Sequence, residues 1–107
     1  MSGFASDWLA LREPYDHAAR DKGLLARLAE WARGRDPLAI VDLGSGTGSN
    51  LRGTMPALPV AQRWTLVEHD PRLIAAGSPG LRDLPAGVTA DYRELDLGRD
   101  LEAAVPA

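Results

Sequence analysis

The sequence contains no cysteine and only two histidines. The absence of cysteine excludes disulfides, thiolate metal sites and cysteine nucleophiles. His17 and His69 have no partner at the spacing of a metal site, so we expect structural or exposed positions for both rather than catalysis. The sequence therefore predicts no metal centre, and it identifies no catalytic residue.

The chain also lacks a long apolar run and an excess of positive charge. No segment reaches the ~20 apolar residues that span a bilayer, and the N-terminus has no basic segment followed by an apolar core. The formal net charge is -3 at pH 7, which disfavours nucleic acid and anionic membranes as partners. These absences predict a cytoplasmic protein with no membrane partner.

What is present is a globular composition. Hydrophobic residues make up 45% and charged residues 25% of the 107 residues, which argues against disorder. A chain of this length forms one domain at most. We expect one domain over residues 1–107, with an N-terminal helical extension at 1–36 and alternating strands and helices at 37–107.

Two helices are expected in the N-terminal extension. Residues 6–12 can form a short helix that Pro14 interrupts. Leucine and alanine at helical spacing predict a second helix over 24–32, ended by the glycine and proline that follow. Trp8 and Trp31 belong to these helices, and we expect both to pack against a sheet.

The most informative stretch is an apolar strand followed by a glycine-rich turn. The run Leu38–Val41 is short and partly β-branched, which favours a strand covered on both faces. Gly44, Gly46 and Gly48 then alternate with small residues, and such spacing lets the backbone approach a ligand closely. A helix expected over 49–58 would direct backbone N–H groups at that ligand. An ordinary flexible loop is the alternative.

Two further strands follow at 63–68 and 88–93, both rich in β-forming residues. Asp70 before Pro71 is a strong helix start, and a last helix is expected over 100–105. This alternation predicts an α/β fold with right-handed crossovers. We expect a three-layer, Rossmann-like arrangement with a partial parallel sheet in the order 3-2-1.

Ligands of such sheets bind outside the carboxyl ends of the strands, where the turn, Glu68 and Asp96 fall. A carboxylate at Glu68 matches two adjacent ribose hydroxyls, and its alternative is a solvated charge at a strand end. Asp96 suits either an exocyclic amine or the cap of a helix. Asp42 ends an apolar strand and needs a partner, either in the turn or in a ligand.

The glycine spacing also discriminates between cofactors. A dinucleotide fingerprint, G-x-G-x-x-G, would place its third glycine at Ser49, and the Gly-Lys-Ser/Thr of a P-loop is missing. Residues 41–48 (VDLGSGTG) instead resemble the first motif of class I S-adenosylmethionine-dependent methyltransferases, and residues 66–70 (LVEHD) resemble the second. The resemblance implies that the turn contacts the methionine moiety, Asp42 lies near its amino acid end, Glu68 holds the ribose hydroxyls and Asp96 lies near the adenine amine.

The resemblance extends from residue 8 onward over the first half of the family's domain. Residues 8–17 are similar to the start of some bacterial members, so Arg12, Tyr15, Asp16 and Arg20 could cover the site. Three strands leave the edge of the first one open. We therefore expect either a truncated methyltransferase or an edge that is closed by a second copy of the chain.

The sequence leaves three possible functions open. The first is binding of S-adenosylmethionine as part of a methyltransferase whose acceptor is unknown. The second is a non-catalytic or oligomer-forming module of the same fold, and the third, which the glycine spacing disfavours, is an NAD(P)-binding oxidoreductase fragment. The candidate cofactor-binding residues are Asp42, Gly44, Ser45, Gly46, Thr47, Gly48, Glu68, His69 and Asp96.

Overall fold

The computed structural model describes residues 2–104, and the surroundings of side chains are described for residues 6–100. Its centre is a sheet of three parallel strands, β1 (Leu38–Leu43), β2 (Gln62–Glu68) and β3 (Val88–Glu94). The α/β class and the parallel pairing are thereby confirmed. The strand order is β1-β2-β3 where the sequence predicted 3-2-1, and in both orders β2 is the central strand.

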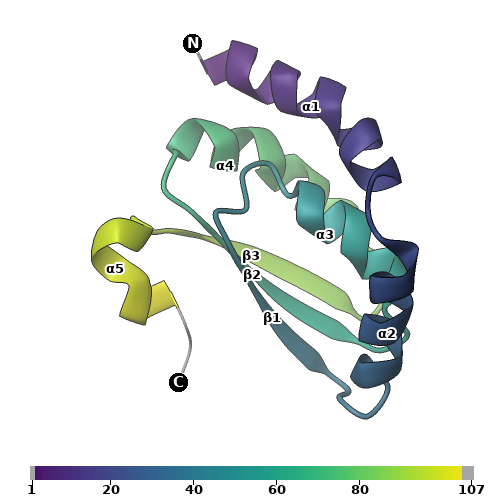
Figure 1. Ribbon diagram of the computed structural model, residues 1–107. Helices are drawn as coiled ribbons and strands as arrows, with labels where there is room; N and C mark the ends of the chain where they lie inside the picture. Colours follow the sequence, from purple (N-terminus) through teal and green to yellow (C-terminus); the bar gives the residue numbers. More distant parts are fainter. Residues whose placement is uncertain (1, 105–107) are drawn as a thin grey trace.

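Helices lie on both sides of this sheet. Those in the described residues are α1 (Ser2–Ala18), α2 (Lys22–Ala32), α3 (Ser49–Thr54), α4 (Pro71–Gly77) and α5 (Leu97–Ala104), with two short 3-10 segments, η1 (Met55–Ala57) and η2 (Ser78–Asp83). Figure 1 shows α1 to α4 gathered on one side of the sheet and α5 on the other, where it contacts β1. Within this part of the chain, no helix has the length and apolar character needed to cross a bilayer.

Alternate side chains of the strands form the core beneath α3. The pairing places Ile40 of β1 opposite Trp64 of β2, and Trp64 opposite Ala90 of β3. Trp64 and Leu66 are buried against Leu51 of α3. Burying an apolar side chain of this size stabilises the fold by roughly 1.5–3 kcal/mol. This packing fixes α3 against the sheet, and with it the turn that precedes α3.

β2 begins one residue earlier than predicted, at the polar and buried Gln62. The side-chain nitrogen of Gln62 donates to the carbonyl of Met55 at 3.1 Å, and its oxygen accepts from the indole N–H of Trp64 at 2.9 Å. A buried amide is tolerated where both ends are hydrogen-bonded. The amide thus ties the end of the helical region before β2 to the core.

The prediction that Pro14 interrupts the first helix is wrong. α1 runs from Ser2 to Ala18 with Pro14 inside it. Proline removes one helical hydrogen bond and strains the turn before it. Contacts that Glu13 and His17 make with other parts of the chain hold the helix on both sides of the proline. Tertiary contacts here override local propensity.

Both tryptophans are more exposed than the predicted packing against a sheet suggests. Trp8 is 53% exposed and Trp31 is 50% exposed. The guanidinium of Arg35 lies 3.9 Å from the centre of the Trp31 ring, so a cation covers part of that ring. The residue of α2 that enters the core is instead the small Ala32, beside Leu38.

Most element boundaries fall near the predicted ones. Asp70 caps α4 by accepting from the Arg72 N–H at 2.9 Å, with Pro71 at the first helical position, as expected. The helix after the glycine turn is shorter than predicted, because α3 ends at Thr54 and a 3-10 segment follows. The last helix begins at Leu97 rather than 100, and the end of its predicted range, residue 105, lies outside the described residues.

Candidate functional site

The carboxyl ends of β1 and β2 meet at the glycine-rich turn. Gly44, Gly46 and Gly48 have φ angles of 72°, 57° and 95°, in the left-handed region that other residues rarely adopt. The N–H groups of Gly44 and Ser45 both donate to the carbonyl of Val67, each at 2.9 Å, and the Gly48 N–H donates to the Ser45 carbonyl at 3.0 Å. The backbone path of this hydrogen-bonded turn therefore favours glycine at all three positions.

Glu68, at the end of β2, lies directly against the turn. It is only 6% exposed, and its carboxylate accepts hydrogen bonds from the N–H groups of Gly46 at 2.8 Å, His69 at 3.0 Å and Asp70 at 3.1 Å. The structure thus brings Glu68 and the turn together. The alternative of a solvated charge is wrong, because the carboxylate is buried and braces the backbone. Its contact with a ribose stays a prediction.

Asp42 lies in β1, two residues before the turn. Its Oδ2 atom is buried and has no hydrogen-bond partner among the described residues. Burial raises the pKa of Asp42 above its usual value and the charge of Glu68 acts in the same direction, whereas Asn50 and Arg20 lower the pKa. A buried carboxylate oxygen without a partner is costly unless a ligand supplies an N–H or a positive charge. This atom is therefore a candidate ligand contact.

A small cavity of about 290 Å³ lies beyond the ends of β2 and β3. It is lined by His69, Glu94, Leu95, Asp96 and Asp100. His69 is exposed, with its Nδ1 atom 3.3 Å from Oε2 of Glu68. Asp96 accepts from the Gly98 N–H at 2.9 Å and so caps the start of α5, which is one of its two predicted roles. Its contact with an adenine amine stays a prediction.

Two residues that the sequence did not single out also contact the turn. The hydroxyl of Tyr92 in β3 donates to the Gly46 carbonyl at 2.9 Å, and the guanidinium of Arg52 in α3 donates to the Thr47 carbonyl at 2.8 Å. Burial raises the pKa of Tyr92 to about 12. Tyr92 is 46 positions from Gly46, so no local pattern could have predicted this contact.

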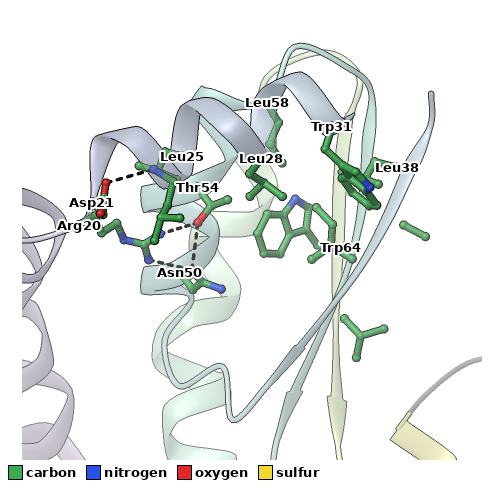
Figure 2. A pocket seen from close by; sticks show the side chains of 14 residues that line it. Arg20, Asp21, Leu25, Leu28, Trp31, Leu38, Asn50, Thr54, Leu58 and Trp64 are labelled. Atoms are coloured by element: carbon green, nitrogen blue, oxygen red, sulfur yellow. Dashed lines mark hydrogen bonds between the residues drawn. The ribbon is translucent and has the colours of Figure 1, made fainter. Parts of the chain in front are cut away.

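A polar stripe formed by the end of α1 and the residues after it faces α3. Glu13, His17 and Arg20 follow one another at spacings of four and three, which places them on one face of a helical segment. The His17 Nε2 atom lies 3.0 Å from the Ser49 carbonyl, and Arg20 donates to the Thr54 hydroxyl at 2.6 Å (Figure 2). That spacing is a sequence signal for the contact, although it is polar and not apolar.

The residues predicted to cover the site from the N-terminal side divide into two groups. Arg20 contacts α3, whereas Arg12 and Asp16 pair with each other at 3.4 Å on the exposed surface and Tyr15 is 79% exposed. That Arg12, Tyr15 and Asp16 cover a bound ligand stays a prediction. The side chain that reaches the turn from α1 is Leu9, whose Cδ1 would lie 3.9 Å from a Cβ atom added to Gly46.

A second, apolar cavity of about 570 Å³ lies between α2 and β1. Leu24, Leu28 and Trp31 of α2 line it together with Val41 of β1. Figure 2 shows its polar end, where Arg20 of the α1–α2 connection is held against α3. The sequence did not predict this groove, because it depends on how far α2 reaches over the edge strand.

The chain matches no protein-family model, and it matches no curated protein sequence. In the described residues, no group of three or more histidine, aspartate or glutamate side chains is arranged to hold a metal ion. The geometry alone therefore carries the functional argument.

Proposed function

We propose that the chain binds S-adenosylmethionine at the carboxyl ends of its strands, as the cofactor-binding part of a class I methyltransferase. The fold would then be the Rossmann-like half-domain with three layers that the sequence suggests. The observation that carries the proposal is the contact between the glycine turn and Glu68, whose carboxylate accepts from the Gly46 N–H at 2.8 Å. Gly46 and Glu68 are 22 residues apart in the sequence, and this hydrogen bond joins the two motifs to which they belong.

The residues present fit the parts of this cofactor. A turn with φ angles that favour glycine leaves its ligand-facing backbone free of side chains. The partnerless Oδ2 of Asp42 suits the ammonium group of the methionine moiety. Glu68 can exchange one N–H partner for a ribose hydroxyl, and the cavity at His69 and Asp96 suits the adenine ring. When bound, the cofactor supplies an electrophilic methyl group.

The same residues favour S-adenosylmethionine over a nicotinamide dinucleotide. The third glycine of a dinucleotide fingerprint would stand where Ser49 is, and the side chain of Ser49 lies 3.2 Å from His17 of α1. An acidic residue on the turn side of the site, Asp42, also disfavours a pyrophosphate. The negative charge of the site thus favours a ligand with a positively charged group.

Calorimetric titration tests the proposal directly. We expect S-adenosylmethionine to bind and NAD to give no heat above dilution. Asp42→Asn should weaken binding of S-adenosylmethionine, whereas Asp91→Asn, an exposed aspartate of β3, should leave it unchanged. Absence of binding at millimolar S-adenosylmethionine would overturn the proposal.

A second candidate function is assembly through the edge of β1. Leu38 N donates to Ala61 O, and Gly44 N donates to Val67 O. The even-numbered residues of β1 therefore direct their backbone N–H and C=O groups toward β2. Backbone groups of the odd-numbered residues 39, 41 and 43 therefore face the outer edge. A second copy of β1, antiparallel and centred on residue 41, would pair all of them and cover the apolar groove.

Light scattering after size exclusion tests this second candidate. We expect a concentration-dependent dimer, and we expect Val41→Lys to give monomers, since a charged residue on an edge strand opposes pairing. Thr89→Lys, at an exposed position of β3, is the matched control and should dimerise like the wild type. A wild-type monomer at every concentration would exclude assembly through this edge.

A further inference from the structure

The glycine turn is held from outside by two side chains that donate to consecutive carbonyl groups. The Tyr92 hydroxyl donates to the Gly46 carbonyl at 2.9 Å. The Arg52 guanidinium donates to the Thr47 carbonyl at 2.8 Å and to the Thr47 hydroxyl at 3.2 Å. Neither donor belongs to the turn, and they come from β3 and α3. The turn is therefore oriented by two side chains outside it, one of them five residues from Thr47 and the other 46 residues from Gly46.

Holding these carbonyls determines where the N–H groups of the turn point. The peptide unit is planar and trans, so a carbonyl and the following N–H point in opposite directions. With the Gly46 carbonyl directed at Tyr92, the Thr47 N–H is directed away from Tyr92. Arg52 holds the next peptide unit, whose Gly48 N–H closes the turn on Ser45. The two donors thus select one of the orientations open to a glycine-rich backbone.

Glu13 of α1 in turn holds Arg52. Its carboxylate forms a two-point ion pair with the guanidinium, with Arg52 Nε donating to Oε2 at 2.7 Å and Nη2 donating to Oε1. Glu13 is only 17% exposed, and the hydrogen bond from Arg52 lowers its pKa below the usual value. The guanidinium is planar and rigid. When a carboxylate holds two of its N–H groups, the direction of its remaining N–H groups is fixed. α1 is thereby linked to the turn.

The Tyr92 hydroxyl lies close to α4 and to the turn. A Cβ atom added to Gly77 of α4 would collide with the Tyr92 hydroxyl and lie 2.7 Å from the Thr47 carbonyl oxygen. A Cβ atom on Gly48 would lie 3.3 Å from Arg52 Nη1. α4, β3 and the turn therefore meet at one point. The absence of a side chain at Gly77 leaves room for the Tyr92 hydroxyl.

We propose that Tyr92 and Arg52 are positioning residues for the ligand of the glycine turn, with Glu13 acting through Arg52. This inference rests on the proposed function, because S-adenosylmethionine is the ligand whose affinity it concerns. Binding sites depend on supporting residues that fix the geometry of the groups in contact with the ligand. Without either donor, a peptide unit of the turn can rotate so that its carbonyl, and not its N–H group, faces the ligand. The affinity for S-adenosylmethionine then falls.

Calorimetry on matched pairs of variants tests the inference. We expect Tyr92→Phe and Arg52→Gln each to weaken S-adenosylmethionine binding about tenfold, the size of one hydrogen bond. Glu13→Gln should have a smaller effect of the same sign. Tyr15→Phe, Arg33→Gln and Glu30→Gln are the controls, since Tyr15 is exposed and Arg33 pairs with Glu30 on the surface of α2. These controls should bind like the wild type.

Two further measurements separate positioning from general stability. In the amide NMR spectrum of the free protein, the Thr47 N–H resonance should shift in Tyr92→Phe but not in Tyr15→Phe. Arg52→Lys, which keeps the charge without the fork, should recover only part of the affinity lost in Arg52→Gln. The effects of Glu13→Gln and Arg52→Gln should not add in the double variant, because they act through one ion pair.

The outcomes distinguish this inference from the proposed function. No binding by the wild type overturns the proposed function and the inference that rests on it. Binding by the wild type with unchanged affinity in Tyr92→Phe and Arg52→Gln overturns the inference alone. If Tyr92→Phe does not fold, as judged by circular dichroism, the series at Arg52, where the side chain is part-exposed, decides the question.

Discussion

The carboxyl end of β1 and the outer edge of β1 belong to one strand. They differ in how much of their surface is in contact with other parts of the chain. At the carboxyl end, the carbonyls of Gly46 and Thr47 and the carboxylate of Glu68 all have partners. Along the edge, apolar side chains of α2 stay in contact with water, with Leu24 61% exposed and Trp31 50% exposed. The first region is organised by the chain itself, whereas the second leaves apolar surface that another surface could cover.

Adding a methyl group to each region gives the largest expected contrast. We expect Gly77→Ala to lower the free energy of unfolding by about 2–3 kcal/mol, because its Cβ would collide with Tyr92 and the turn. Gly34→Ala, after α2, should change it by less than about 0.5 kcal/mol, since no atom lies within 4 Å of the added carbon. Urea denaturation measures both, and equal costs would contradict the comparison.

Removing a charge tests the hydrogen bonds at the carboxyl end. Glu68→Gln keeps the size of the side chain but places an NH₂ group against backbone N–H donors. We expect the free energy of unfolding to fall by about 2 kcal/mol. Glu30→Gln, on the exposed surface of α2, should have almost no effect. A small loss at Glu68 would show that these hydrogen bonds contribute little.

High pH probes the same end through Tyr92. Its pKa is raised to about 12 by burial, from an ordinary value near 10. The unfolded chain therefore loses this proton first, so the stability of the fold should decrease as the pH rises from about 10 to 12. Unfolding measured across this range should show that decrease in the wild type, and Tyr92→Phe should remove the Tyr92 contribution. Tyr15→Phe should retain it.

The smallest effect is expected in the groove. Leu24→Ser should change the free energy of unfolding by no more than about 0.5 kcal/mol, because Leu24 is already largely exposed. If the apolar surface of α2 drives association, the same variant should reduce light scattering at high concentration. A marked loss of stability in Leu24→Ser would show that the groove is part of the core.

The sequence predicted the alternation of strands and helices, and the structure confirms it. Local signals were sufficient where they act within a few residues. Asp70 and Pro71 mark the start of α4, and the glycines at 44, 46 and 48 adopt the backbone angles that glycine favours. The sequence also suggested that Glu68 would reach the turn, because parallel strands end at the same edge of a sheet.

Other features were beyond local reasoning. Pro14 was expected to end a helix, but contacts of Glu13 and His17 with α3 hold the chain helical around it. Trp8 and Trp31 were expected to pack against a sheet, but each is about half exposed. Their exposure depends on how α1 and α2 are placed against the sheet, which no pattern within either helix specifies.

The amino-acid sequence by itself determined the order of the elements and the glycine turn, because propensity, capping and glycine's conformational freedom act over a few residues. Only the tertiary structure decided what holds that turn. Tyr92 is 46 residues from Gly46, and Glu13 is 39 from Arg52, so these contacts exist only once β3 and α1 are packed against α3. The packing of the strands and helices decides which of these side chains meet.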